Sequence, residues 1–188
     1  MIPNSCTFCF ALLLLLSETQ AQTPVNVPQG AAWIDVPYVH QPREGCGAAS
    51  LAMVMTYWAA QQGKASGAES DVATIQRELY SPRDHGISAE RMSEYLLRHG
   101  FEAFAINGNW SDLEEQLLKG RPLIVALRPK GQNELHYVVV VGFDKAHDSL
   151  TVNDPAVRKL LTRERAGFEK EWGATHNWLL LALPTANP

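Results

Sequence analysis

The stretch Gln41-Pro-Arg-Glu-Gly-Cys46-Gly-Ala-Ala-Ser-Leu-Ala-Met53 places one cysteine between two glycines, directly before an alanine-rich run. Apolar residues follow the i, i+3, i+4 and i+7 spacing of one helix face at Leu51, Val54, Met55 and Trp58. This spacing predicts a helix over residues 48–60, with Cys46 just before its first turn. A helix N-terminus has unpaired backbone N–H groups and a positive dipole end, which favour a thiolate over a thiol. The thiolate is the reactive form of cysteine, so Cys46 is the candidate nucleophile.

Residues around Cys46 could complete such a site. The side-chain amide of Gln41, five residues upstream, could reach the same point as the backbone N–H of Cys46. Together these two donors would form an oxyanion hole, in which the loss of one donor typically lowers the rate by roughly a hundredfold or more. Gly45 and Gly47 would let a substrate backbone approach closely. We expect Glu44 to face solvent, although its carboxylate could select basic substrates.

A cysteine nucleophile needs a base, and the base needs a group that orients it. His136 begins the run His-Tyr-Val-Val-Val-Val-Gly-Phe-Asp144, and Asp154 ends the strand candidate that follows. If these two strands pair as a hairpin around residues 144–149, His136 and Asp154 come side by side. The same two residues have simpler explanations, because a lone histidine is more often structural and an aspartate before Pro155 is a common turn signal.

The remaining pattern predicts an α+β domain with a helical half packed on a mostly antiparallel sheet. Further helices are expected over 71–79, with Asp71 as the cap, and over 88–99. A capping box of Ser111 and Glu114 predicts a short helix that ends at Gly120. Helical structure is also expected over 162–172. Extended segments are expected at 33–39, 101–106, 122–127, 135–143, 150–153 and 178–183, with four consecutive valines marking a central strand covered on both faces.

Composition excludes several classes of function. The chain has 188 residues, a net charge of −4 and no run of Lys or Arg, which argues against nucleic acid as a partner. The histidines show no metal-ligand spacing, so neither a metal nor another cofactor is expected.

The N-terminus resembles a secretory signal peptide. The apolar run Phe8–Leu16 contains five consecutive leucines, is too short to span a bilayer, and is followed by polar residues and Ala21. No Lys or Arg precedes it, which is unusual, and an uncleaved membrane anchor is the alternative. Cleavage after Ala21 would give a periplasmic or extracellular protein without a stable membrane insertion. Its single cysteine would be Cys46.

Taken together, the stretch 41–58, the run from His136 to Asp144 and Val152-Asn-Asp-Pro-Ala156 resemble the C39 peptidases and the C39-like proteins around them. The resemblance runs from about residue 36 to residue 183, nearly the whole of the chain that follows the expected signal peptide. It implies a papain-like fold and cleavage of a peptide or protein substrate through a thioester acyl-enzyme. It also implies that Cys46 is the nucleophile, His136 the base, Asp154 its orienter and Gln41 the oxyanion donor.

The chain departs from the exporter domains of this family, which remove double-glycine leaders from bacteriocins. It has no exporter segment or phosphate-binding loop, it carries its own signal sequence, and its Gln-to-Cys spacing is one residue shorter. The expected organisation is therefore a signal peptide (1–21), a lead-in segment (22–32) and a stand-alone exported C39-like peptidase domain (33–184). Two alternatives stay open: a cysteine amidase or transpeptidase acting on cell-wall peptides, and a non-catalytic peptide-binding module on the same fold.

Overall fold

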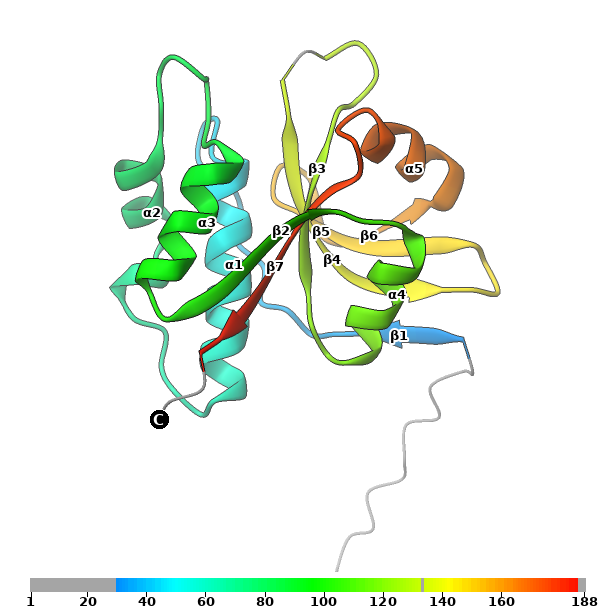
Figure 1. Cartoon of the computed structure of the whole chain (residues 1–188), viewed down its shortest axis with the longest axis horizontal. Coiled ribbons are helices and arrows are strands. Elements are labelled where there is room, and N and C mark those ends of the chain that lie inside the picture. Colours follow the sequence, from blue (N-terminus) through cyan, green and yellow to red (C-terminus); the bar gives the residue numbers. More distant parts are fainter. Residues whose placement is uncertain (1–29, 133, 186–188) are drawn as a thin grey trace, which may run out of the picture.

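Helices form one side of the protein and an antiparallel sheet forms the middle (Figure 1). The computed structural model describes residues 30–132 and 134–185, so the expected signal peptide and residues 22–29 of the lead-in segment lie outside the described residues. The main helices are α1 (Cys46–Gln61), α2 (Val72–Leu79), α3 (Ala89–Arg98), α4 (Trp110–Leu118) and α5 (Arg165–Gly173), with a 3-10 turn η1 (Ala68–Ser70) before α2. None of the helices in the described ranges has the length and apolar character needed to cross a membrane.

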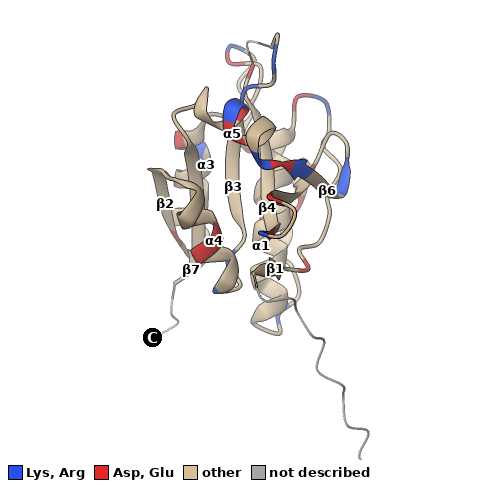
Figure 2. Cartoon of the chain, turned by 90° about the vertical axis from the view of Figure 1, so that its right-hand side faces the viewer, with Lys and Arg blue, Asp and Glu red and all other residues tan. Residues whose placement is uncertain are grey.

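The sheet has the strand order β2-β7-β3-β4-β5-β6, and β1 pairs with β4 beside it. The strands are β1 (Ala31–Trp33), β2 (Phe101–Asn107), β3 (Leu123–Leu127), β4 (His136–Asp144), β5 (Ser149–Asp154), β6 (Arg158–Glu164) and β7 (Trp178–Pro184). Helices α1, α2 and α3 cover one face, while α4 and α5 lie on the other (Figures 1 and 2). The expected α+β architecture is confirmed.

Helix α1 is the centre of the helical half. Its sequence predicted one apolar stripe, yet every residue from Gly47 to Met55 is buried. The small side chains at positions 47–50 and 52 allow this, because they let α2 and the sheet pack closely on opposite sides of the helix. Full burial of Leu51 or Met53 stabilises the fold by about 1.5–3 kcal/mol each.

Strand β4 is the expected central strand. The four valines from Val138 to Val141 have no exposed surface, and β4 lies between β3 and β5. Residues that alternate toward the two faces are all buried because α1 packs on one face and α4 on the other. The buried central strand of the sheet therefore carries His136 at its first residue.

Two local predictions were wrong. The capping box of α4 is formed by Asn109 and Asp112, two residues before the predicted pair, and Glu114 instead accepts a hydrogen bond from the Trp110 indole. The predicted helix over 162–172 begins only at Arg165, because residues 158–164 form the edge strand β6. Charged residues of both signs are interspersed on β6 and α5 (Figure 2), as is common on exposed sheet edges.

The segment after β1 also differs from expectation. Extended structure was predicted for 33–39, but β1 ends at Trp33 and begins at Ala31, inside the expected lead-in segment. Just beyond β1, the backbone N–H of Ile34 donates a hydrogen bond to the Val141 carbonyl, at 2.8 Å. The chain then leaves the sheet and runs to the N-terminus of α1.

Candidate active site

Cys46 is the first residue of α1 and is partly exposed. The turn before it closes through a hydrogen bond from Gly45 N–H to the Pro42 carbonyl, at 3.0 Å. Gly45 is required there, because an added Cβ would lie 2.5 Å from Cγ of Pro42 and 2.9 Å from its carbonyl oxygen. No side chain caps the helix at Gly45, so N–H groups of the first turn are left for another acceptor.

His136 and Asp154 are brought together by the predicted hairpin. They are the first residue of β4 and the last residue of β5, which pair antiparallel around residues 145–148. Nε2 of His136 lies 2.8 Å from Oδ1 of Asp154, and the two side chains are 19 % and 6 % exposed. Asp154 also accepts a hydrogen bond from Ala156 N–H at 3.0 Å, which holds the carboxylate toward the ring.

The electrostatics of this pair favour the charged forms. Burial lowers the pKa of the His136 imidazole, but hydrogen bonds to Asp154 and Cys46 and the negative charges of both groups raise it, to about 9. Burial raises the pKa of Asp154, but the hydrogen bond and charge of His136 outweigh this effect, so the pKa of the carboxyl lies below its usual value. Because an ionised Asp154 only accepts, Nε2 carries a proton, and Nδ1 is the ring nitrogen that the contact with Asp154 leaves unused.

Gln41 is held beside the same segment. Its backbone N–H donates to the Pro155 carbonyl at 3.0 Å, and the Tyr38 hydroxyl donates to the Asp154 carbonyl at 3.1 Å. Within the described residues, the side-chain oxygen Oε1 of Gln41 is buried without a hydrogen-bond partner. The structure thus ties Gln41 to the Asp154 loop, and its role as an oxyanion donor stays a prediction.

Sequence reasoning did not identify the residues that fix this geometry. Asn153 is fully buried; its Nδ2 donates to the Val36 carbonyl at 3.1 Å and its Oδ1 accepts from Leu160 N–H at 3.0 Å. Asn153, in β5, therefore connects strand β6 to the segment that leads from β1 to Gln41. The Asn-Asp-Pro motif was a usable signal for Asn153, whereas nothing in the sequence distinguishes Tyr38 from the other tyrosines.

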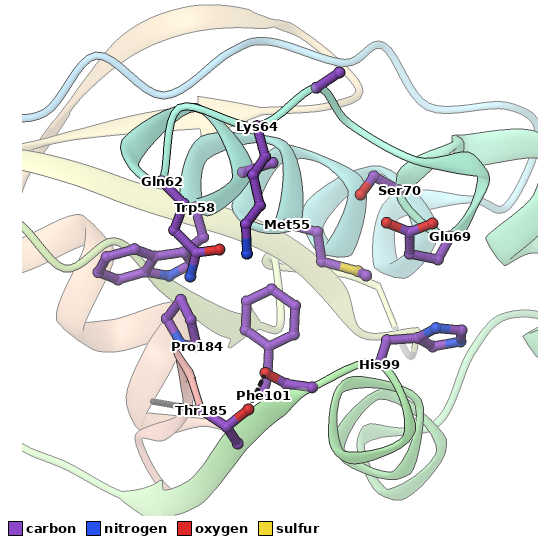
Figure 3. Close-up of a pocket in the computed structure, with 13 residues that line it drawn as sticks. Met55, Trp58, Gln62, Lys64, Glu69, Ser70, His99, Phe101, Pro184 and Thr185 are labelled. Atoms are coloured by element: carbon purple, nitrogen blue, oxygen red, sulfur yellow. Dashed lines mark hydrogen bonds between the residues drawn. The ribbon is translucent and has the colours of Figure 1, made fainter. Parts of the chain in front are cut away.

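A hollow of about 570 Å³ lies at the other end of α1, between Trp58, Phe101 and Lys64 (Figure 3). Trp58 comes twelve residues after Cys46, which corresponds to roughly 18 Å along a helix. This hollow is therefore separate from the Cys46, His136 and Asp154 cluster. Within residues 30–132 and 134–185, no group of three His, Cys, Asp or Glu side chains is placed to hold a metal ion.

Comparison with known proteins identifies the group to which this arrangement belongs. The model of the peptidase C39-like family matches residues 33–179, most of the chain. The chain belongs to the peptidase C39-like family. This membership indicates a cysteine peptidase. No curated protein matches the chain significantly.

Solved structures agree with the C39-like assignment. A protein described as a C39-like peptidase, from Bacillus anthracis, has a TM-score of 0.61 at 16 % identity, covering 84 % of this chain and 99 % of its own. The peptidase domain of Streptococcus ComA, a bifunctional ABC transporter, has a TM-score of 0.60 at 25 % identity, with 79 % and 98 % coverage. A structure of the mite allergens Blo t 1 and Der p 1 has a TM-score of 0.53 at 14 % identity, with 89 % and 74 % coverage. The C39-like chain therefore has the expected papain-like fold.

Proposed function

We propose that the protein is an exported cysteine peptidase in which Cys46 is the nucleophile, His136 the acid and base, Asp154 its orienter and Gln41 an oxyanion donor. The observation that supports this most strongly is the 2.8 Å contact of His136 with Asp154, combined with the effect of Cys46, at the start of α1, in raising the pKa of His136. A thiol, an imidazole and a carboxylate in this order are the constellation of nucleophilic acyl transfer.

In the proposed reaction, the Cys46 sulfur attacks the carbonyl carbon of a peptide bond and the carbonyl oxygen becomes an oxyanion. The Cys46 backbone N–H and the Gln41 amide donate hydrogen bonds to that oxygen. The C–N bond breaks as His136 gives its proton to the departing amine, which leaves a thioester on Cys46. Water then attacks the thioester while His136 takes one of its protons, and the C–S bond breaks to return the thiolate.

A peptide substrate is supported by one relative in particular. A double-glycine motif protease from an AMS/PCAT transporter has been solved in complex with a leader peptide; it has a TM-score of 0.60 at 23 % identity, with 82 % coverage of this chain and 95 % of its own. We extend only the class of substrate, a peptide, to this protein. The spacing from Gln41 to Cys46 is one residue shorter than in the exporter domains, so the double-glycine specificity is not extended to this protein.

Export is proposed from the sequence alone. The apolar run Phe8–Leu16 and the small residue Ala21 support cleavage of a signal peptide before Gln22. N-terminal sequencing of the protein isolated from its own cells tests this. We expect Gln22 as the first residue, and a membrane-bound protein that retains Met1 contradicts it.

The decisive experiment for activity compares the protein with Cys46→Ala on a peptide library read by mass spectrometry. We expect new termini only with the wild-type protein, and rapid alkylation of Cys46 by iodoacetamide at mildly acidic pH. Cys46→Ser is the matched control, because it keeps the size and polarity of the side chain but not the thiol. Equal cleavage by all three proteins, or alkylation no faster than that of free cysteine, would overturn the proposal.

A further inference from the structure

A second hollow lies next to Cys46, on the side of α2. It measures about 470 Å³ and is lined by Arg43, Glu44, Gln76, Tyr80, Pro82 and His85. We call it the Glu44 pocket. Glu44 is two residues before Cys46, so their Cα atoms are at most about 7.6 Å apart. Neighbouring Cα atoms of a substrate peptide are about 3.8 Å apart, and a long side chain extends that reach, so a long side chain next to the attacked bond can enter this pocket.

Glu44 has an unusual conformation. Its φ of 54° is in the left-handed region, where a residue with a Cβ is strained and where glycine is the usual choice. Its carboxylate is not free in solvent as the sequence suggested: the side chain is 31 % exposed, and Oε2 accepts a hydrogen bond from the Tyr80 hydroxyl. A strained backbone that aims a fixed carboxylate into a hollow beside the nucleophile points to a use for that carboxylate.

Residues that line this pocket carry acceptor oxygens that lack a hydrogen-bond donor among the described residues. His85 Nδ1 lies 3.9 Å from Oε1 of Glu44, beyond hydrogen-bond distance. Gln76 donates its Nε2 to the Arg43 carbonyl at 3.4 Å, and its Oε1 is buried without a partner among the described residues. An ammonium or guanidinium group carries several N–H donors and no acceptor, so it would pair with Oε1 of Glu44.

We propose that the Glu44 pocket binds a lysine or arginine side chain of the peptide, adjacent to the bond that Cys46 attacks; this specificity rests on the proposed peptidase function. An apolar side chain would leave Oε1 of Glu44 without a donor, and an acidic side chain would be repelled by the Glu44 carboxylate. Arg43, whose side chain is exposed, brings a positive charge to the residues that line the pocket.

Matched substrates test the proposal. Once library profiling has located the cleaved bond, peptides are compared that differ only by arginine against citrulline, its neutral isostere, at the positions on either side. We expect the wild-type protein to prefer arginine at one position by about tenfold in kcat/KM, as a charge-assisted hydrogen bond predicts. Glu44→Gln should reduce the ratio to near one. Arg43→Gln, which removes the opposing charge, should keep or raise it.

Two further measurements keep a failure interpretable. Glu44→Gly allows the left-handed backbone and removes the carboxylate, so an arginine-to-citrulline ratio near one in this variant as well as in Glu44→Gln assigns the preference to the carboxylate and not to the shape of the turn. Peptidyl acyloxymethyl ketones with arginine or citrulline alkylate a thiol by forming a C–S bond and releasing a carboxylate. They report the preference at Cys46 even if no peptide is hydrolysed.

The outcomes are therefore distinct. Hydrolysis with equal rates for arginine and citrulline, or a preference for acidic side chains, overturns the Glu44 pocket and leaves the peptidase intact. An arginine preference in alkylation without hydrolysis supports the pocket and contradicts the peptidase. A preference that survives in Glu44→Gln also overturns the assignment, and failure of both ketones to label Cys46 overturns both proposals.

Discussion

His136 and Asp154 are separated by eighteen positions in the chain, yet Nε2 of one lies 2.8 Å from Oδ1 of the other. The pairing of β4 with β5 brings them together, since the open end of an antiparallel hairpin joins the first residue of one strand to the last of the next. The contact is nearly excluded from solvent, so it orients the ring and favours the imidazolium form. The consequences for pH dependence and stability can be measured.

The first prediction concerns the alkaline limit of activity. Departure of the amine requires a protonated His136, whose pKa is raised to about 9 against the opposing effect of burial. We expect kcat/KM to fall as the pH rises through about 9. In Asp154→Asn this fall in kcat/KM should occur at lower pH, because the variant lacks the carboxylate that stabilises the protonated His136. Asp144→Asn is the matched control: Asp144 pairs with His147 at 2.6 Å on the exposed turn of the same hairpin. If the fall in kcat/KM moved to lower pH by the same amount in both variants, the prediction would be contradicted.

The second prediction concerns the free energy of unfolding. A histidine whose pKa is raised in the folded state stabilises the fold fully below its unfolded pKa of about 6.5, and this contribution is lost as the pH rises through about 9. This shift of the His136 pKa corresponds to roughly 3 kcal/mol between pH 6 and pH 10. Urea unfolding of the wild-type protein and of His136→Gln at pH 6 and pH 10 measures it. The stability difference between the two proteins should shrink by this amount at pH 10; a constant difference counts against the raised pKa.

Much of the site was predictable because its signals are local. The valine run and the Asp-Lys-Ala-His-Asp turn specify a hairpin, and the hairpin alone places His136 beside Asp154. The glycine before Cys46 and the apolar spacing after it likewise locate the start of α1. In each case the residues that decide the structure lie within one or two elements of each other.

The misses have physical causes. Asn109 with Asp112 and Ser111 with Glu114 both fit a capping box, and the choice depends on where β2 ends, at Asn107. Part of strand β6 was predicted as helix because it carries many charged residues. It carries them because it lies at the edge of the sheet, next to β5. Contacts distant in sequence had no local signal, as with Glu44 and Tyr80, which are 36 positions apart.

The third prediction concerns Asn153, which joins two segments of the site. Asn153→Ala leaves the Val36 carbonyl and the Leu160 N–H without their partner in a buried environment. Because each unsatisfied buried group costs about 1–3 kcal/mol, we expect a loss of roughly 2–4 kcal/mol in the free energy of unfolding by urea. Asn109→Ala, which removes an exposed helix cap, should cost only about 1 kcal/mol. Equal losses in the two variants would mean that burial of Asn153 adds nothing.

The fourth prediction uses two glycines in different surroundings. In Gly45→Ala, the new methyl group would lie 2.5 Å from Cγ of Pro42, so the turn must shift and carry the start of α1 with it. Since a displacement of about 1 Å at a reacting group can lower the rate by roughly a hundredfold, we expect kcat to fall by at least tenfold.

Gly167→Ala is the control, because Gly167 lies inside α5 with no atom within 4 Å of the added methyl. It should raise the free energy of unfolding by about 0.5–1 kcal/mol and leave kcat unchanged, since alanine is the better helix former. Thermal unfolding and steady-state kinetics on one peptide measure both variants. If Gly45→Ala retains full kcat, the close approach of Pro42 does not position Cys46, and the turn serves only to connect β1 to α1.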